Sequence, residues 1–388
     1  MRIGIDGATW ENSRGYGRFT RELMRALLNI DSRNAYVLFV SPFVPNDSLP
    51  PNAQLVKVQT RYAPASAASA DGARSARDMW AFTRAMATAR LDLIFFPSVY
   101  SFVPVLDPRR VVVTIHDVIP ERFPQHVFKT ARARLFWTLK TQLAVAQATR
   151  VLTVSEHSRQ GIQKYFRIAP EKIRVASEAP AAAFHPISDR ALVDAAFNRV
   201  GLSSSARVLV YLGGLSPHKN LPMLIQVFAD LVRAEPFADL KLLIIGDNAR
   251  DVFYTHYPAL RAQVDALSQH AVIFTGFLED AVVVPLLNGA QACILPSLDE
   301  GFGLPGIEAA ACGTPVIATQ FSALPELLGD AAIYIDPTRP AELRAAIEIV
   351  LTDASLRKTM SAMGLERARC LTWEASAKRV LQTLEEAV

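Results

Sequence analysis

The chain of 388 residues has little cysteine and no long apolar run. Its three cysteines, Cys293, Cys312 and Cys370, lie in hydrophobic surroundings without the spacing of a metal site, so we expect reduced packing residues. No run approaches the roughly 20 apolar residues that a membrane-spanning helix needs. The start, MRIGIDGATW, goes directly into a predicted strand and lacks the regions of a signal peptide. These absences predict a cytoplasmic protein.

The first half of the chain is short of acidic residues. Residues 1–188 carry 25 Lys and Arg against 14 Asp and Glu, a net +11, and residues 189–388 carry 16 against 23, a net −7, which together give the +4 of the chain. A basic half indicates an anionic partner, such as an anionic membrane surface or a phosphorylated acceptor. A scatter of solvated arginines is the alternative. Because no nucleic-acid-binding motif is present, no nucleic-acid partner is expected.

Short apolar runs alternate with helical patterns along the chain. Most runs are continuous and β-branched or aromatic, which is typical of parallel strands buried on both faces. This alternation predicts an α/β fold with doubly wound sheets, whose ligands gather at the carboxyl ends of the strands. The predicted strands are Arg2–Asp6, Tyr36–Val40, Gln54–Val58, Leu93–Phe96, Val111–Ile115, Val151–Val154, Val208–Leu212, Leu242–Ile245, Val272–Phe274, Ala292–Leu295, Val316–Ala318 and Ile333–Ile335.

The alternation is interrupted at residues 177–206, which contain Pro180, Pro186 and a run of serines. A chain of this length can bury two hydrophobic cores, and we place the linker between them near 180–190. The predicted domains are therefore residues 1–185 and 186–370, each Rossmann-like, followed by a C-terminal helix within 371–388.

The most informative stretch is 296–315, PSLDEGFGLPGIEAAACGTP, directly after a predicted strand. Glu300 follows that strand, a Gly-rich turn comes next, Pro305 opens a short helix and Gly313 closes it. The unpaired N–H groups at the start of such a helix bind anions. With Glu308 on the helix, two acids and an anion site suit a sugar nucleotide, which carries hydroxyls at both ends and charge between them.

The string E-G-F-G-L-P-x-x-E, followed by A-x-G-T-P-V-I-A, closely resembles the E-x7-E signature of the retaining family 4 glycosyltransferases. This resemblance implies the GT-B fold, in which two Rossmann-like domains face a central cleft. It also implies transfer of a sugar from a nucleotide-diphosphate donor to an acceptor. In that family the last helix often crosses back to the first domain, and Trp373–Leu384 is the candidate here.

The resemblance assigns roles to the residues of this stretch. Glu300 would lie beside the donor hexose, and Glu308 would bind the ribose hydroxyls. The backbone N–H groups of Phe302, Gly303 and Leu304 would complete the hexose and phosphate contacts. In T-G-F-L-E-D, Phe277 and Leu278 would contact the base by main chain.

The loop GGLSPHKN after Val208–Leu212 is a second candidate phosphate site. Gly213 and Gly214 would let the backbone approach a phosphate, and Lys219 would supply a point charge for the diphosphate. Family members usually add an Arg here, and His218 replaces it only in part. A surface turn with an exposed lysine is the alternative.

No D-x-D pair stands in a loop after a strand, where it would hold Mg²⁺ to a diphosphate. Cations and helix N-termini can stabilise the departing diphosphate instead. The sequence therefore favours a metal-independent enzyme, as the resemblance implies, with no metal site and no cofactor.

Two further groups are expected in the first half. Gly15-Tyr16-Gly17 lies before a predicted helix, but Thr20 replaces the third glycine of a dinucleotide fingerprint. By resemblance, Gly15 and Gly17 approach the donor phosphates; a simple turn is the alternative. His116, in T-I-H-D-x-x-P, would hydrogen-bond the transferred sugar by resemblance, and a role as general base for the acceptor is the less favoured alternative.

Residues 122–140, RFPQHVFKTARARLFWTLK, mix five basic residues with aromatic side chains. This composition predicts either a helix at a membrane interface, which would make the protein peripheral on the inner face of the plasma membrane, or a helix that packs its aromatics inward.

The function expected from the sequence is that of a retaining hexosyltransferase acting on a glycan or lipid-linked glycan acceptor in polysaccharide biosynthesis. GDP-mannose is the favoured donor, because P-H-K-N resembles the loop of mannosyl-transferring relatives. A GT-B sugar-nucleotide epimerase and a non-catalytic nucleotide-sugar-binding protein stay open as alternatives.

Overall fold

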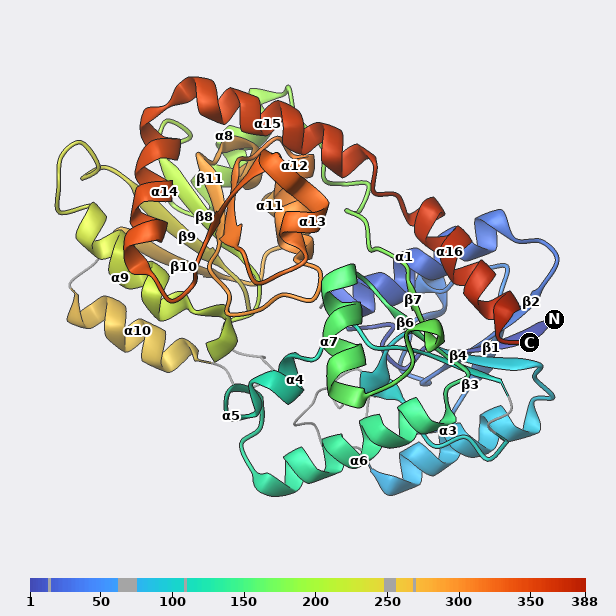
Figure 1. The fold of residues 1–388 in the computed structure, drawn as a ribbon. Helices are drawn as coiled ribbons and strands as arrows, with labels where there is room; N and C mark the ends of the chain where they lie inside the picture. Colours follow the sequence, from blue (N-terminus) through green and yellow to red (C-terminus); the bar gives the residue numbers. More distant parts are fainter. Residues whose placement is uncertain (13–14, 62–74, 108–109, 248–255, 268–269) are drawn as a thin grey trace. The chain divides into compact units, whose positions relative to one another are not determined.

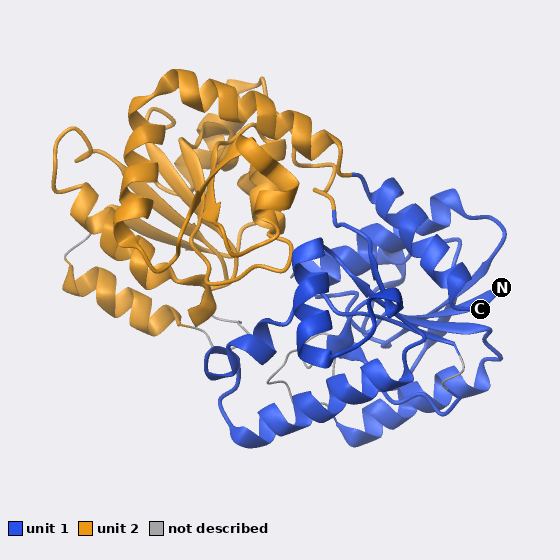
Figure 2. Ribbon diagram, viewed as in Figure 1, with its two compact units in different colours: residues 1–178, 372–388 blue, residues 179–371 orange. Residues whose placement is uncertain are grey.

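The computed structural model describes residues 1–12, 15–61, 75–107, 110–247, 256–267 and 270–388 (Figure 1). The chain forms two compact units, coloured separately in Figure 2. Unit 1 comprises residues 1–178 and 372–388, and unit 2 comprises residues 179–371. The two units are defined by packing alone. The domain boundaries at residues 185 and 370, which were predicted as limits of function, therefore stay predictions.

Unit 1 contains a seven-stranded parallel sheet in the order β3-β2-β1-β4-β5-β6-β7. Figure 1 shows helices on both faces of this sheet, with α3 and α6 on one face and α1 and α16 on the other. The elements are β1 (Arg2–Asp6), α1 (Gly15–Ile30), β2 (Ala35–Val40), β3 (Gln54–Lys57), α3 (Ala76–Thr88), β4 (Leu93–Phe96), β5 (Val111–Thr114), α4 (Ile119–Arg122), α5 (Pro124–Val127), α6 (Ala131–Gln147), β6 (Arg150–Thr153), α7 (Glu156–Phe166), β7 (Ile173–Val175) and α16 (Trp373–Glu386), with short 3-10 turns at Asn46–Ser48, Val99–Ser101 and Pro170–Lys172.

Unit 2 contains a six-stranded parallel sheet in the order β10-β9-β8-β11-β12-β13. Its elements are α8 (Arg190–Arg199), β8 (Val208–Leu212), α9 (Leu221–Leu231), β9 (Lys241–Ile245), α10 (Tyr257–Ala266), β10 (Val272–Gly276), α11 (Asp280–Gly289), β11 (Ala292–Leu295), α12 (Leu304–Ala311), β12 (Val316–Thr319), α13 (Leu324–Leu328), β13 (Ala332–Ile335), α14 (Pro340–Thr352) and α15 (Ala354–Arg369), with 3-10 turns at Pro217–Lys219 and Gly329–Ala331.

The predicted strands are all present, and the central ones are buried along their length, as continuous apolar runs require. The expected α/β class with two doubly wound sheets is confirmed. Strand β7 was not predicted. It has only three residues, Arg174 stands at its centre, and it lies at the edge of its sheet, so it lacks the apolar run of a buried strand.

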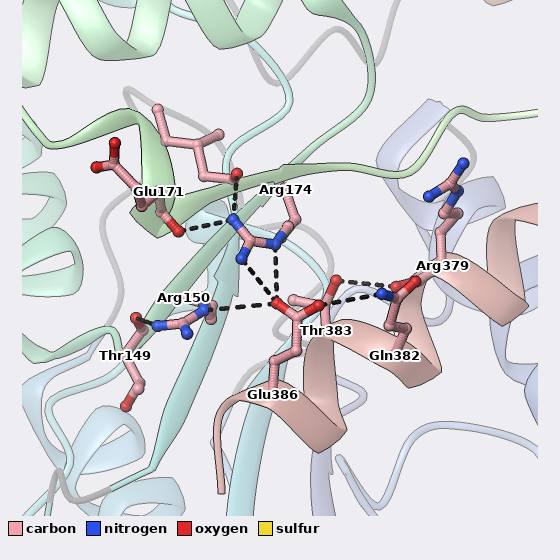
Figure 3. A network of polar contacts seen from close by, with 9 residues as sticks. Thr149, Arg150, Glu171, Arg174, Arg379, Gln382, Thr383 and Glu386 are labelled. Atoms are coloured by element: carbon pink, nitrogen blue, oxygen red, sulfur yellow. Dashed lines mark hydrogen bonds and ion pairs between the residues drawn. The ribbon is translucent and has the colours of Figure 1, made fainter.

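The terminal helix α16 packs against α1 within unit 1, with Ala377, Val380 and Leu384 buried. A polar network holds its last turn to the sheet edge (Figure 3). Both Nε and a terminal nitrogen of Arg174 lie 2.8 Å from the Glu386 carboxylate, and Arg150 Nε lies 3.9 Å from it. The end of the described chain is therefore an integral part of unit 1.

Candidate active site

The strand order reverses once in each unit, and each reversal separates two loops at the carboxyl end of the sheet. In unit 2 the reversal lies between β8 and β11, so the loops that follow these two strands diverge there. In open α/β sheets, ligands bind outside the strand ends at such a reversal. The loop after β8 carries Gly213–Asn220 and the loop after β11 carries Glu300, so the sequence-predicted phosphate and sugar residues flank the same point.

Lys219 and Glu300 form an ion pair at this point. Nζ of Lys219 lies 2.7 Å from Oε1 of Glu300, and the two side chains are only 18% and 10% exposed. Ser297 Oγ donates a second hydrogen bond, also 2.7 Å, to the same oxygen. A mostly buried pair of this kind holds one cation and one carboxylate in fixed positions, which suits a ligand that carries both negative charge and hydroxyls.

Asn220 ties the loop after β8 to two other strand ends. It adopts a left-handed conformation with φ 56°, and its Nδ2 donates to Pro296 O at 3.1 Å and to Pro337 O at 2.8 Å. The backbone of Leu298 adds a hydrogen bond to His218 O at 2.8 Å. These contacts fix the position of Lys219, because His218 and Asn220 flank it in the chain.

The backbone is tightly packed beside Gly213. A Cβ on Gly246 would lie 2.1 Å from the carbonyl oxygen of Gly213, and Gly213 itself has φ 149°. Tyr211 donates its hydroxyl hydrogen to Gly214 O at 2.6 Å. Burial, reinforced by the negative charge of Glu300, raises the pKa of Tyr211 well above its usual value, so this phenol stays protonated as a donor.

Gly303 is the N-cap residue of helix α12, directly before its first residue. It has φ 82°, in the left-handed region, and a Cβ here would lie 2.8 Å from Leu324. Pro305 stands in the first turn, as predicted, and Gly313, with φ 78°, follows the end of the helix. The side chains of Phe302 and Leu304 are buried, so what this turn offers a ligand is its backbone.

Glu308 lies within α12 and is buried. Its negative charge adds to burial in raising the pKa of Cys293, on β11, and of Cys312, after α12, each to about 12. Phe277 and Leu278 follow β10 in the same unit, where Phe277 is 60% exposed.

Gly15 and Gly17 lie in the first turn of α1 rather than in a loop before it, so the expectation that they precede the helix is wrong. A Cβ on Gly17 would lie 2.0 Å from Asn12 O, whereas no described atom lies within 4 Å of a Cβ on Gly15. Gly17 therefore permits a close approach of backbone to backbone, which explains a glycine inside the helix.

His116 follows β5, and both of its ring nitrogens face acceptors. Nε2 lies 3.0 Å from Pro97 O, and Nδ1 lies 3.2 Å from Oε1 of Glu178. The ring also packs edge to face with Phe19, with centroids 4.8 Å apart. Sequence reasoning missed Glu178, because the strand before it, β7, was not recognised.

The described ranges contain no group of three or more His, Cys, Asp or Glu side chains placed to hold a metal ion. Among the same residues, no helix is both long enough and apolar enough to cross a membrane.

Two family models match the chain. The model described as Glycosyltransferase Family 4 matches residues 13–178, and the model described as Glycosyl transferases group 1 matches residues 206–353. Among curated proteins, the chain is 28% identical to the O-antigen chain mannosyltransferase B of Escherichia coli over 270 residues, which is 68% of this chain and 67% of that protein. Across several curated relatives, the match spans between about a third and two thirds of the relative's length.

Solved structures share the fold over the whole chain. Sucrose-phosphate synthase from Thermosynechococcus elongatus superposes with a TM-score of 0.78 at 19% identity, covering 100% of this chain and 98% of that one. HepE from Anabaena, solved with UDP and glucose, gives a TM-score of 0.72 at 17% identity, with both chains covered completely.

Proposed function

The chain belongs to the group 1, family 4 glycosyltransferases with the GT-B fold, and on this premise we propose that it is a retaining, metal-independent hexosyltransferase. Its donor is a nucleotide-diphosphate sugar, and its acceptor is a glycan or lipid-linked glycan of polysaccharide biosynthesis. The Lys219–Glu300 pair, held at the strand reversal beside the start of α12, is the observation that carries this proposal.

The proposed donor site uses both members of the pair. The diphosphate binds the backbone N–H groups at Gly303 and Leu304 and draws the ammonium of Lys219 toward it. Glu300 then accepts hydrogen bonds from the hexose, and Glu308 binds the ribose. His218, Gly213 and Gly214 line the phosphates, Phe277 and Leu278 contact the base, and Gly15 and Gly17 approach the diphosphate. His116 hydrogen-bonds the transferred sugar.

In the transfer step, the bond between the anomeric carbon and the diphosphate oxygen breaks, and the acceptor oxygen bonds to that carbon on the same face of the ring. The acceptor's proton passes to the departing diphosphate. Negative charge grows on the leaving group, and Lys219 with the α12 N–H groups stabilises it, which removes the need for a metal ion.

GDP-mannose is the donor that we favour. The P-H-K-N loop and the similarity to a curated mannosyltransferase support this choice. A thermal-shift panel of UDP-, GDP- and dTDP-sugars tests it, because bound donor stabilises the folded state according to its affinity. We expect the largest shift with GDP-mannose, and a larger shift with another nucleotide sugar would correct the donor.

Two alternatives are separated by one measurement. An epimerase would convert the donor without any acceptor, and a non-catalytic binding protein would be stabilised by the donor but would turn over nothing. Donor turnover that requires an added glycan acceptor supports the transferase.

We also propose that unit 1 works at an anionic membrane surface through the outer face of α6. Trp137 packs inward, whereas Leu135, Leu139 and Leu143 are exposed and, being four residues apart, share one face of the helix. Residues 122–155 carry six Lys and Arg and no Asp or Glu. An exposed apolar stripe within a cationic segment is typical of an interfacial helix.

Vesicle flotation tests the membrane proposal. We expect retention on vesicles with anionic lipid at low salt, loss of retention at high salt, and weaker binding of Leu139→Gln. Leu192→Gln, at an exposed leucine of α8 in unit 2, is the matched control. Equal binding to neutral and anionic vesicles, or none to either, would contradict the proposal.

A further inference from the structure

Unit 1 contains a buried carboxylate to which the proposed function gives no role. Glu178 follows β7, is 5% exposed, and is the last residue of unit 1 before the chain enters unit 2. Within the described residues, His116 is the one side chain with which this carboxylate forms a hydrogen bond or ion pair. Burial disfavours a charge that has no partner, so the contact with His116 accounts for the burial of this carboxylate.

The proton positions of His116 follow from its two partners. Pro97 O is a carbonyl and can only accept, so Nε2 must carry a hydrogen and donate it. The carboxylate of Glu178 also accepts, so the 3.2 Å contact at Nδ1 requires a proton between nitrogen and oxygen. In this arrangement neither ring nitrogen keeps a free lone pair.

Other neighbours hold the ring without competing for these protons. Phe19, from α1, packs against it, and Trp373, the first residue of α16, packs against Phe19 with centroids 5.9 Å apart. The adjacent carboxylate, Asp117, accepts a hydrogen bond from the backbone of Ile119 at 2.9 Å. Glu178 is therefore the charged group in direct contact with the imidazole nitrogens.

We propose that Glu178 is a positioning residue for His116: its carboxylate keeps a proton on Nδ1, fixes the ring, and makes His116 a hydrogen-bond donor rather than a general base. This inference rests on the proposed function and selects between the two roles that the sequence left open. A ring with a proton on each nitrogen cannot take the acceptor's proton, which must then go to the departing diphosphate. Such a ring holds a sugar oxygen when Nε2–H exchanges its contact with Pro97 O for that oxygen.

The nitrogen NMR signals of His116 test the proposal in the free protein. Histidine labelled with ¹⁵N would be assigned by comparison with His116→Asn. From the two contacts of the ring we expect a proton on each nitrogen of wild-type His116. In Glu178→Gln we expect Nδ1 to lose its proton, because the glutamine amide can donate to the nitrogen instead. An unprotonated Nδ1 in the wild type would overturn the proposal, whether or not the variant folds.

Kinetics give a second, separate readout. Glu178→Ala should lower kcat on the order of 10²-fold, the cost of a misplaced group, with donor KM unchanged, and Glu178→Gln should recover part of the loss by restoring a hydrogen bond. Glu171→Gln, an exposed carboxylate of the same unit, is the control for lost charge. A fall in melting temperature without any change in kcat would overturn the positioning role. If no transferase activity is found, the proposed function is wrong, and the NMR measurement still tests the contact between Glu178 and His116 independently.

Discussion

Lys219 Nζ lies 2.7 Å from Glu300 Oε1, although 81 residues separate them in the chain. The contact joins the loop after β8 to the loop after β11 and is shielded from solvent on most sides. In the free protein each charge satisfies the other, so a bound diphosphate must compete with Glu300 for the ammonium. A change at either residue should therefore alter both the free energy of unfolding and the proposed reaction.

Removing the lysine should affect both stability and turnover. Lys219→Ala leaves Glu300 unpaired, which we expect to lower the free energy of unfolding by about 2–3 kcal/mol, less than for a fully buried pair because both side chains are partly exposed. It should also lower kcat about 10²–10³-fold by removing the cation at the leaving group. Denaturant unfolding and steady-state kinetics measure the two effects.

A double-mutant cycle separates these effects. Lys219→Ala combined with Glu300→Gln should recover stability, since no unpaired charge remains, but should recover no activity. Recovery of turnover along with stability, or near-normal turnover of Lys219→Ala itself, would rule out the proposed role of the lysine.

The two glutamates should affect different kinetic constants. Glu308→Ala should mainly raise the donor KM, because ribose contacts are the same in the ground state and the transition state, whereas Glu300→Ala should lower kcat. Initial rates over a range of donor concentrations make the comparison. Kinetic constants that change in neither variant would argue against both assignments.

The two glycines at the start of α1 should differ sharply in tolerance to alanine. A Cβ on Gly17 would meet the backbone oxygen of Asn12 at 2.0 Å, so Gly17→Ala must shift backbone and should cost about 1–3 kcal/mol. Gly15→Ala, two residues away in the same turn, meets no described atom within 4 Å and should be neutral or stabilising by up to about 1 kcal/mol. Thermal unfolding of the two variants checks this, and equal melting temperatures would contradict it.

Helix α16 should be held by apolar packing more than by its ion pairs. Leu384 is fully buried, and Leu384→Ala should cost about 2–5 kcal/mol. Glu386 and its partner Arg174 are about a third exposed, so Glu386→Gln should cost no more than about 1 kcal/mol, and less at high salt. Chemical denaturation of both variants ranks them, and a larger loss for Glu386→Gln would show that the network of Figure 3 dominates.

The fold was predictable where strands are continuous apolar runs. A strand buried on both faces, such as β4 or β5, has apolar residues at every position, and this is recognisable in the sequence. The signal failed at β7, whose central residue, Arg174, serves the contact with α16. The start of α1 was misplaced because a glycine pair reads as a turn, and only the packing of Gly17 on Asn12 explains it.

The candidate site followed the same division. Lys219 and Glu300 were predicted to serve one site, because each follows a predicted strand of the same parallel sheet. Their direct contact depends on the order β8–β11, which no local pattern carries. The neighbours of His116 were unpredictable for the same reason, because Glu178 reaches it from 62 residues away.

The three thiols provide a test of burial in unit 2. Cys293 and Cys312 are buried, and burial together with the charge of Glu308 raises the pKa of each to about 12. Only the thiolate reacts with alkylating reagents, so at pH 8 about one in 10⁴ of these groups would be reactive even if it were accessible. Cys370 is exposed.

We therefore expect iodoacetamide to modify one thiol per folded chain at pH 8, located by mass spectrometry at Cys370, and all three in denaturant. Cys370→Ser should abolish the native reaction and leave two thiols in denaturant, and rapid native labelling of Cys293 would show that α12 does not stay packed on β11.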